Sequence, residues 1–236
     1  YTTWKAIGTS GGDLSFFQDF FVKFYQAFIE SDRWLQYLNG VKTTLLVTAL
    51  ALILGIVLGV LVAMLRTAHD QQRPGHRNPI LAVLNLICKV YVTVIIFASS
   101  RNFTMIGTLT LGINSGAYVS EIVRGGLMSV DKGQMEAGRS LGLNYMTTMR
   151  FIVIPQAVKA ILPALGNEFI ILLKDTSLIT VIGGKELLYA AQGIYNRTYE
   201  QMFPLIGTAA LYLVLVIILS WLLGKLERRL RQSDRR

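Results

Sequence analysis

The 236-residue sequence is 53% hydrophobic and 16% charged, with a mean hydropathy of +0.49 and a formal net charge of +9. This composition is too apolar for a water-soluble surface, which argues against a soluble enzyme. The basic residues form short clusters between apolar runs, so the positive charge fits membrane-flanking loops better than a nucleic-acid surface. The single cysteine, Cys88, excludes an internal disulfide framework and a paired-cysteine metal cluster.

Aromatic residues before the first long apolar run recur at spacings of three and four, which places them on one face of a helix. They are Phe16, Phe17, Phe20, Phe21, Phe24, Tyr25 and Phe28. Such a helix lies at a membrane surface or packs against neighbouring spans, and the sequence favours neither alternative. We expect residues 1–40 to form an external or interfacial segment.

Five apolar runs are long enough to cross a bilayer, because about 20 helical residues span roughly 30 Å of hydrocarbon. The runs are Leu45–Leu65, Ile80–Ser100, Phe103 to about Val119, Phe151–Leu173 and Phe203–Gly224. We therefore predict an all-α, polytopic membrane protein. Residues 1–236 form a single domain with a five-span core at 43–224.

Lysine and arginine predict the orientation of these spans. The segments Arg66–Arg77, Ser120–Arg150 and Lys225–Arg236 hold 3, 4 and 6 basic residues. In a five-span chain these segments share one side of the membrane, and the positive-inside rule makes that side cytoplasmic. The N-terminus is then outside, and residues 225–236 form a basic cytoplasmic tail.

Polar residues inside the spans are the candidates for chemistry, because none of the common hydrolase, zinc or nucleotide-loop motifs occurs. Burying an ionisable group in a span costs about 2.5 kcal/mol or more, so Lys159 and Glu168 are expected to face a protein interior or an aqueous path. Seven-residue steps return to nearly the same helix face. We therefore expect Asn167 to align with Lys174, and Glu168 with Asp175.

A zwitterionic solute needs an acceptor for its ammonium group and donors for its carboxylate. The candidate substrate path comprises Asn114, Ser115, Asn167, Glu168, Lys174, Asp175, Thr176 and Ser177. The alternative is structural: Lys174 and Asp175 pair with each other or extend to the interface, and Asn114 makes an ordinary interhelical hydrogen bond.

Residues 133–143 predict a short amphipathic helix that ends at Gly142, with Met135, Gly138 and Leu141 on one face. A helix of this kind docks into a partner or packs beneath its own bundle. Composition leaves both alternatives open.

This segment resembles the EAA loop of the permease subunits of binding-protein-dependent ATP-binding cassette (ABC) importers. The resemblance rests on the sequences of Gly133–Gly138, Leu141–Gly142 and Ile154–Ala157, with their spacing from acid to glycine to proline. Further stretches resemble the polar amino acid branch of these importers. They are Tyr37–Gly40, Asn114–Gly126, Lys174–Leu178 and Glu186–Leu187.

The resemblance implies a permease that moves a polar amino acid across the bacterial cytoplasmic (inner) membrane by alternating access. Its implied partners are a second identical or related permease subunit, a cytoplasmic ABC ATPase dimer, an extracytoplasmic solute-binding protein and the lipid bilayer, with no nucleic acid. ATP and Mg would bind the ATPase, and this chain would hold no cofactor. The alternative is a non-transporting scaffold or sensor that docks the same ATPase.

Within the loop at 120–150, the resemblance implies a cytoplasmic coupling helix that sits in a cleft of the ATPase and transmits its closure to the spans. The residues it assigns to coupling are Gly133, Gln134, Glu136, Ala137, Gly138, Leu141, Gly142 and Pro155.

Two features depart from the family pattern. Gly138 stands where the family has an alanine, and a helix-interior glycine costs about 1 kcal/mol, so we expect a looser coupling helix that still docks. The family also has a longer stretch after the second span, whereas Val94–Ala98 leads here almost directly to Arg101. The chain is either shorter at this point or lacks residues, and the second alternative predicts a spatial break between about Thr93 and Phe103.

Overall fold

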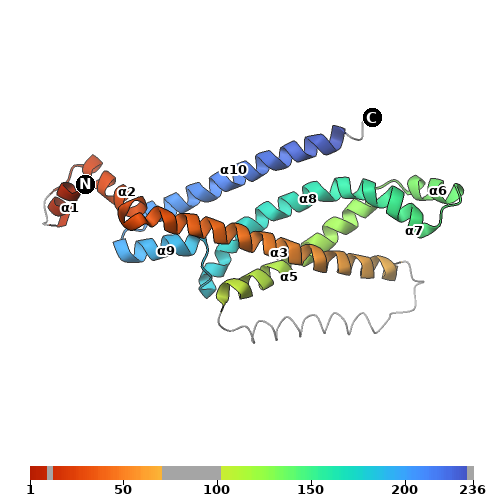
Figure 1. Cartoon of the computed structure of the whole chain (residues 1–236), viewed down its shortest axis with the longest axis horizontal. Coiled ribbons are helices and arrows are strands. Elements are labelled where there is room, and N and C mark those ends of the chain that lie inside the picture. Colours follow the sequence, from red (N-terminus) through yellow and green to blue (C-terminus); the bar gives the residue numbers. More distant parts are fainter. Residues whose placement is uncertain (10–12, 71–101, 233–236) are drawn as a thin grey trace.

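The computed structural model describes residues 1–9, 13–70 and 102–232, and this part of the chain is helical without strands (Figure 1). The all-α class predicted from the sequence is thereby confirmed. In chain order the elements are α1 (Thr2–Thr9), α2 (Phe16–Phe28), the 3-10 turn η1 (Glu30–Asp32), α3 (Arg33–Asp70), α5 (Phe103–Met128), α6 (Lys132–Ser140), α7 (Tyr145–Thr148), the π-helical turn η2 (Met149–Val153), α8 (Ile154–Asp175), the 3-10 segment η3 (Thr176–Ile182), α9 (Leu187–Thr198) and α10 (Met202–Gln232). The predicted second span Ile80–Ser100, Cys88 and the suggested break lie outside the described residues.

Three helical runs in the described residues are long and apolar enough to cross a membrane: Glu30–Leu61, Tyr145–Ile182 and Met202–Leu230. The second and third of these runs contain the fourth and fifth predicted spans, and the first contains Leu45–Leu61 of the first predicted span. The predicted third span falls in α5, whose apolar residues are interrupted by small and polar ones. The count of five spans and their orientation remain predictions.

Helix α5 begins at Phe103 as predicted, because the side chain of Asn102 caps it by accepting a hydrogen bond from the Met105 backbone N–H at 3.3 Å. The helix ends at Met128, well beyond the predicted end near Val119. Arg124 Nε donates to Glu121 Oε2 at 2.9 Å, one helical turn away. This pair supports the polar extension of the helix.

Helices α3 and α5 form the most extensive interhelical contact. Glycine makes it possible: a Cβ added to Gly59 would lie 2.7 Å from Val119 Cγ1, and one added to Gly112 would lie 2.7 Å from Leu54 Cδ2. Small residues allow helix backbones to approach closely where no water is present to drive association. The adjoining core cluster draws residues from α3, α5, α8 and η3; its members are Val47, Ala51, Leu111, Leu172 and Ile179.

The outer surface of this bundle is apolar. Large aliphatic side chains follow one face of α3 at helical spacing and are about half exposed; they are Leu46, Leu50, Ile53, Val57 and Leu61. An apolar stripe of this length on the surface suits contact with lipid.

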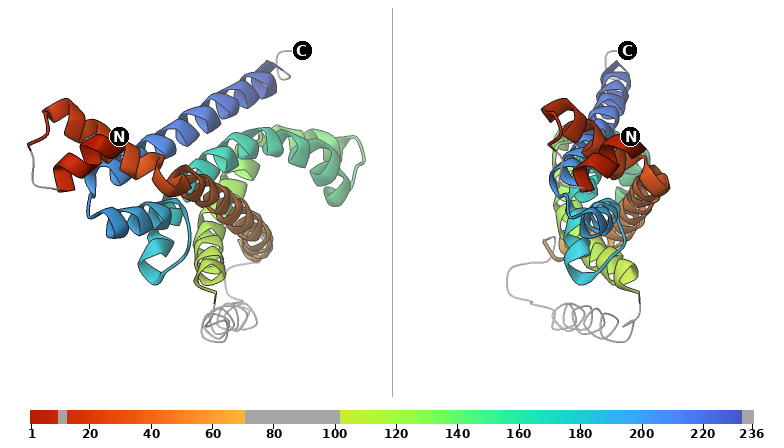
Figure 2. Two further views of the ribbon diagram at one scale, coloured as in Figure 1. Left: turned by 60° about the vertical axis from the view of Figure 1, so that its left-hand side comes forward. Right: turned by 90° about the vertical axis from the view of Figure 1, so that its left-hand side faces the viewer.

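The molecule has two distinct ends. Helices α1, α2 and α9 lie at one end of its long axis, and α6 lies at the other (Figures 1 and 2). Helix α10 runs from the α9 end towards the α6 end, so its basic residues Lys225, Arg228 and Arg229 approach the end that carries α6 (Figure 1). The segments 120–150 and 225–232 therefore share one end, as the charge pattern predicts.

The aromatic face of α2 packs in part on the spans, which is one of the two alternatives left open by the sequence; its contact with a membrane surface stays a prediction. Phe20 packs edge-to-face against Phe203 of α10 with ring centroids 5.1 Å apart, and Phe28 stacks on Tyr37 of α3 at 5.5 Å. Phe16 and Phe17 remain 78% and 79% exposed. Phe20 and Phe28 thus pack on the spans, whereas the first turn of α2 is exposed.

Candidate functional site

Helix α6 has well-defined ends. The carboxylate of Asp131 accepts a hydrogen bond from the Gly133 N–H at 3.0 Å and caps the first turn. At the other end, the Leu143 N–H donates to the Gly138 carbonyl at 3.1 Å and the Gly142 N–H to the Arg139 carbonyl at 3.0 Å. This is a Schellman motif, and it needs a left-handed residue, which Gly142 supplies with φ of 82°. The predicted end at Gly142 is confirmed.

Gly138 is buried where α6 packs on α7. A Cβ added to Gly138 would lie 2.5 Å from Thr148 Cγ2 and 2.8 Å from Thr148 Oγ1. The sequence led us to expect that this glycine loosens the helix, but the structure gives it a different role. Its missing side chain allows α6 to pack closely, which offsets its poor helix propensity.

The opposite face of α6 is open. Of the residues assigned to coupling by the resemblance, all but Gly138 are exposed, and Leu141 is 80% exposed. Gln134 also contacts the bundle, because Gln156 Nε2 of α8 donates to its Oε1 at 3.2 Å. Helix α6 therefore packs beneath its own bundle on one side and presents a second side without a partner in the described chain.

The contact between α6 and α8 leads into one continuous helical run. Residues Tyr145–Ile182, which we call the α8 run, comprise α7, η2, α8 and η3. Pro155 has no N–H to donate, and the chain adapts by a π-helical turn in which the Ile154 N–H bonds to the Met149 carbonyl. The helical run continues through Pro155 into α8.

Glu168 lies on the α8 run between Gln156 and Thr180 and is buried, with 6% of its surface exposed. Ser115 of α5, which is fully buried, donates from Oγ to Glu168 Oε1 at 2.8 Å. On the far side of Ser115, Gly55 of α3 comes so close that an added Cβ would lie 2.9 Å from this Oγ. Two of the predicted substrate-path residues thus meet inside the bundle.

The other predicted path residues do not join this pair. Asn114, Asn167 and Lys174 are exposed, and Asp175 is partly exposed. Thr176 and Ser177 donate their hydroxyl hydrogens to the backbone carbonyls of Leu173 and Lys174, at 2.7 and 2.8 Å. The described chain does not gather the predicted polar stripe into one cluster.

Glu186, which is only 1% exposed, is a buried acid for which the sequence indicated no site role. This carboxylate caps α9 by accepting the Tyr189 N–H at 2.9 Å, and it also accepts the Tyr212 hydroxyl at 2.6 Å. The local signal was present: an acid after two glycines and before an apolar helix is a typical N-cap. No comparable sequence pattern indicated that distant residues such as Tyr212 would bond to Glu186.

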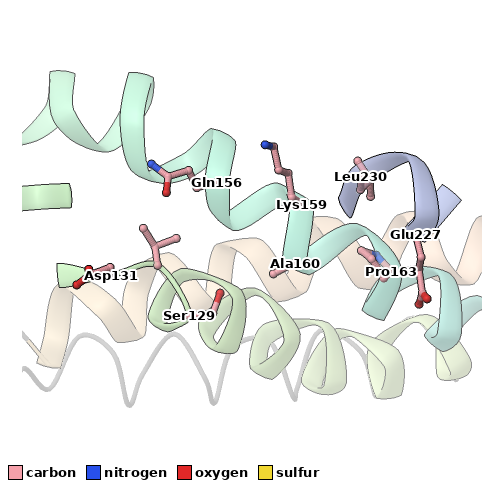
Figure 3. A pocket seen from close by; sticks show the side chains of 9 residues that line it. Ser129, Asp131, Gln156, Lys159, Ala160, Pro163, Glu227 and Leu230 are labelled. Atoms are coloured by element: carbon pink, nitrogen blue, oxygen red, sulfur yellow. The ribbon is translucent and has the colours of Figure 1, made fainter. Parts of the chain in front are cut away.

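A hollow of about 480 Å³ lies near α6, between the end of α5, the start of α8 and the end of α10. Its lining residues are Ser129, Val130, Asp131, Gln156, Lys159, Ala160, Pro163, Glu227 and Leu230. The Lys159 ammonium points away from Ser129 and Asp131 (Figure 3). The charged groups therefore do not converge on a ligand position, and we leave this hollow out of the candidate site.

Comparison with known proteins places the chain in a family. Residues 78–232 match the family model described as "Binding-protein-dependent transport system inner membrane component". The chain belongs to this family, which confirms the class of protein expected from the EAA-like loop: a membrane permease component of an ABC importer.

Individual relatives agree with this assignment. The glutamine transport system permease protein GlnP of Escherichia coli (strain K12) is 43% identical over 123 residues, which cover 52% of this chain and 56% of that protein. The probable glutamine ABC transporter permease protein GlnM of Bacillus subtilis (strain 168) is 35% identical over 208 residues, covering 86% of this chain and 96% of the relative.

Solved structures share the fold. The crystal structure of an amino acid ABC transporter with histidines matches with a TM-score of 0.70 at 37% identity, covering 82% of this chain and 94% of that one. An inward-facing MetNI methionine ABC transporter matches with a TM-score of 0.67 over 86% of this chain and 99% of that one. At 18% identity the second likeness concerns the fold alone.

The contact between Gly138 and Thr148 can be tested by a pair of substitutions. Gly138→Ala should lower the free energy of unfolding by about 1–3 kcal/mol, because the added methyl group overpacks the α6–α7 contact. Adding Thr148→Ala should recover part of this loss, since it removes the two clashing atoms. Thermal unfolding of the purified protein in detergent measures both effects.

Gly133→Ala is the matched control on the same helix, because its added Cβ would be no closer than 3.6 Å to Asp131. A Gly138→Ala protein as stable as this control would contradict the packing role.

Proposed function

We propose that this chain is the permease subunit of an ABC importer that translocates a polar amino acid across the bacterial cytoplasmic membrane by alternating access. The observation that carries the proposal is the buried pair of Ser115 and Glu168, held between α5 and α8 at 2.8 Å in a member of this transport family. Each further step follows from the position of this pair and of α6.

Glu168 suits the ammonium group of an amino acid. A carboxylate inside an apolar bundle has lost its hydration, and its hydrogen bond from Ser115 leaves acceptor capacity on its oxygens. An ammonium group supplies donors and a compensating charge. The pairing would be strong because both groups leave water together.

The amino acid side chain is proposed from the relatives. Two of them are named for glutamine transport, and the solved structure with 37% identity is described as an amino acid transporter with histidines. We propose a polar amino acid of that size as the substrate. Asn114, Asn167, Lys174, Asp175, Thr176 and Ser177 remain candidates for a path opened in another state of the cycle.

The exposed side of α6 is the proposed coupling surface. It carries Glu136, Ala137 and Leu141, a mixture of charge and apolar area that fits a cleft in a cytoplasmic ATPase dimer. ATP and Mg would bind on that partner. The close packing of Gly138 on Thr148 would make α6 move with the α8 run as a rigid body.

The two ends of the molecule give the proposed orientation. The α6 end gathers the basic residues of the segments 120–150 and 225–232, so it faces the cytoplasm by the positive-inside rule. The end with α1, α2 and α9 then faces outward, towards a solute-binding protein. A second identical or related permease subunit would pair with this one, and the two five-span subunits together would enclose the substrate path.

Reversing the charge of Glu136 tests the coupling surface. Glu136→Arg should detach or uncouple the ATPase while the spans stay folded. The new positive charge would be repelled by a like charge or left without a partner in the docked interface, and either costs several kcal/mol. The readouts are co-purification of the ATPase and uptake by reconstituted vesicles.

Asp13→Arg, an exposed charge reversal at the opposite end of the chain, serves as the control. If Glu136→Arg assembles and transports like this control, the coupling role of Glu136 is wrong.

Removing the charge of Glu168 tests the substrate site. Glu168→Gln keeps the shape and the acceptor for Ser115 but loses the ion pair with the substrate, worth about 1.5–3 kcal/mol. The apparent KM for the amino acid should rise roughly tenfold or more, with normal assembly. Glu121→Gln, an exposed acid of α5, is the control. Normal KM in Glu168→Gln vesicles would remove this residue from the site.

A further inference from the structure

Glu186 joins four separate elements at the end of the molecule remote from α6. Its Oε1 accepts the N–H of Tyr189 at 2.9 Å in α9 and the hydroxyl of Thr180 in η3. Its Oε2 accepts the hydroxyl of Tyr212 in α10 at 2.6 Å and that of Thr44 in α3 at 3.5 Å. We call these five residues the Glu186 node.

An ionised carboxylate accepts hydrogen bonds but cannot donate them, and each of the other four residues in the node donates a hydrogen bond to Glu186. Thr44 adds a second connection, because its oxygen accepts the Leu187 N–H at 3.2 Å. Thr44 is fully buried, and Glu186 is 1% exposed. Removing one donor leaves the buried carboxylate with less compensation for its lost hydration, so the node resists opening.

The residues around the node are also closely packed. A Cβ added to Gly40 of α3 would lie 2.8 Å from Leu187 Cα, so α3 touches the backbone at the start of α9. An apolar cluster of Tyr37, Leu187, Ala191 and Ile194 adjoins this contact. Helices α3 and α9 thus form a fixed support for the node.

The node holds one end of the α8 run, and α6 contacts the other. Twelve residues separate Gln156, which bonds to α6, from Glu168, and twelve more separate Glu168 from Thr180 in the node. At 1.5 Å per residue in the α-helix and about 2.0 Å in the 3-10 segment η3, the two halves are about 18 and 20 Å long. Glu168 therefore lies near the middle of a helical rod whose far end is fastened.

We propose that Glu186 is a positioning residue for transport: it fastens the outer end of the α8 run to α3 and α10, so that displacement of α6 turns Glu168 about this fixed end. The proposal rests on the proposed function and adds a pivot to it. With the outer end fixed, Glu168 moves by about half the displacement of α6. With that end released, the run shifts as a whole. ATP hydrolysis on the partner then no longer turns Glu168 efficiently.

The expected signature separates this role from simple stability. Glu168 still binds the amino acid when the node is weakened, so the KM for uptake stays near that of the wild type. The ATPase still docks on α6, so hydrolysis continues. The number of amino acids accumulated per ATP hydrolysed is the quantity that falls.

The experiment uses the complete complex in vesicles, with its ATPase and solute-binding protein, and measures uptake and ATP hydrolysis together. Thr180→Val removes the hydroxyl group that donates to Glu186 at similar volume, whereas Thr180→Ser keeps it. Glu186→Gln keeps the shape of the side chain and removes its charge. We expect uptake per ATP to fall roughly fivefold in Thr180→Val and Glu186→Gln, with KM within about twofold, and Thr180→Ser to behave like the wild type.

Unchanged uptake per ATP in Thr180→Val and Glu186→Gln would overturn the proposal. A lower yield of complex with normal uptake per ATP would also overturn it, because the node would then serve stability alone. Failure of the wild-type complex to accumulate any amino acid would instead refute the proposed function, so the two failures are distinguishable.

Discussion

A helix that crosses a bilayer must satisfy its backbone hydrogen bonds internally, and this constraint governs the α8 run. The run stays helical from Tyr145 to Ile182 although Pro155 and Pro163 remove two N–H donors. A π-helical turn before Pro155 absorbs part of that loss. Because the run does not break, three of its residues belong to one helical element: Gln156, which contacts α6, the buried Glu168, and Thr180, which bonds to Glu186.

The glycines of α3 and α5 shape the surface against which the α8 run packs. Gly59 and Gly112 let the two helices approach until their backbones are nearly in contact, and the α8 run packs beside them. Glu168 then meets Ser115 in a buried position. A buried carboxylate is costly unless it is paired, so its retention here fits a role in binding a cationic group better than a role in stability.

Local patterns predicted the parts of the structure that depend on nearby residues. Gly142 marked the end of α6, Phe103 the start of α5, and a lone acid in an apolar run marked Glu168 as buried. The role of Gly138 depends on Thr148, which α7 brings back against α6. Glu186 bonds to Thr44, 142 residues away, and to Tyr212, 26 residues away. Helical periodicity gives the face of each residue but not the helix opposite, so these contacts, and the separation of Asn167 from the buried pair, required the structure.

Uptake by the wild-type complex tests the central claim most directly. The permease, its ATPase and its solute-binding protein would be reconstituted in vesicles and offered a panel of labelled amino acids. The account predicts accumulation of one or a few polar amino acids against a gradient, dependent on both ATP and the solute-binding protein. ATP hydrolysis that responds to the amino acid without any accumulation would contradict it and would identify the complex as a sensor.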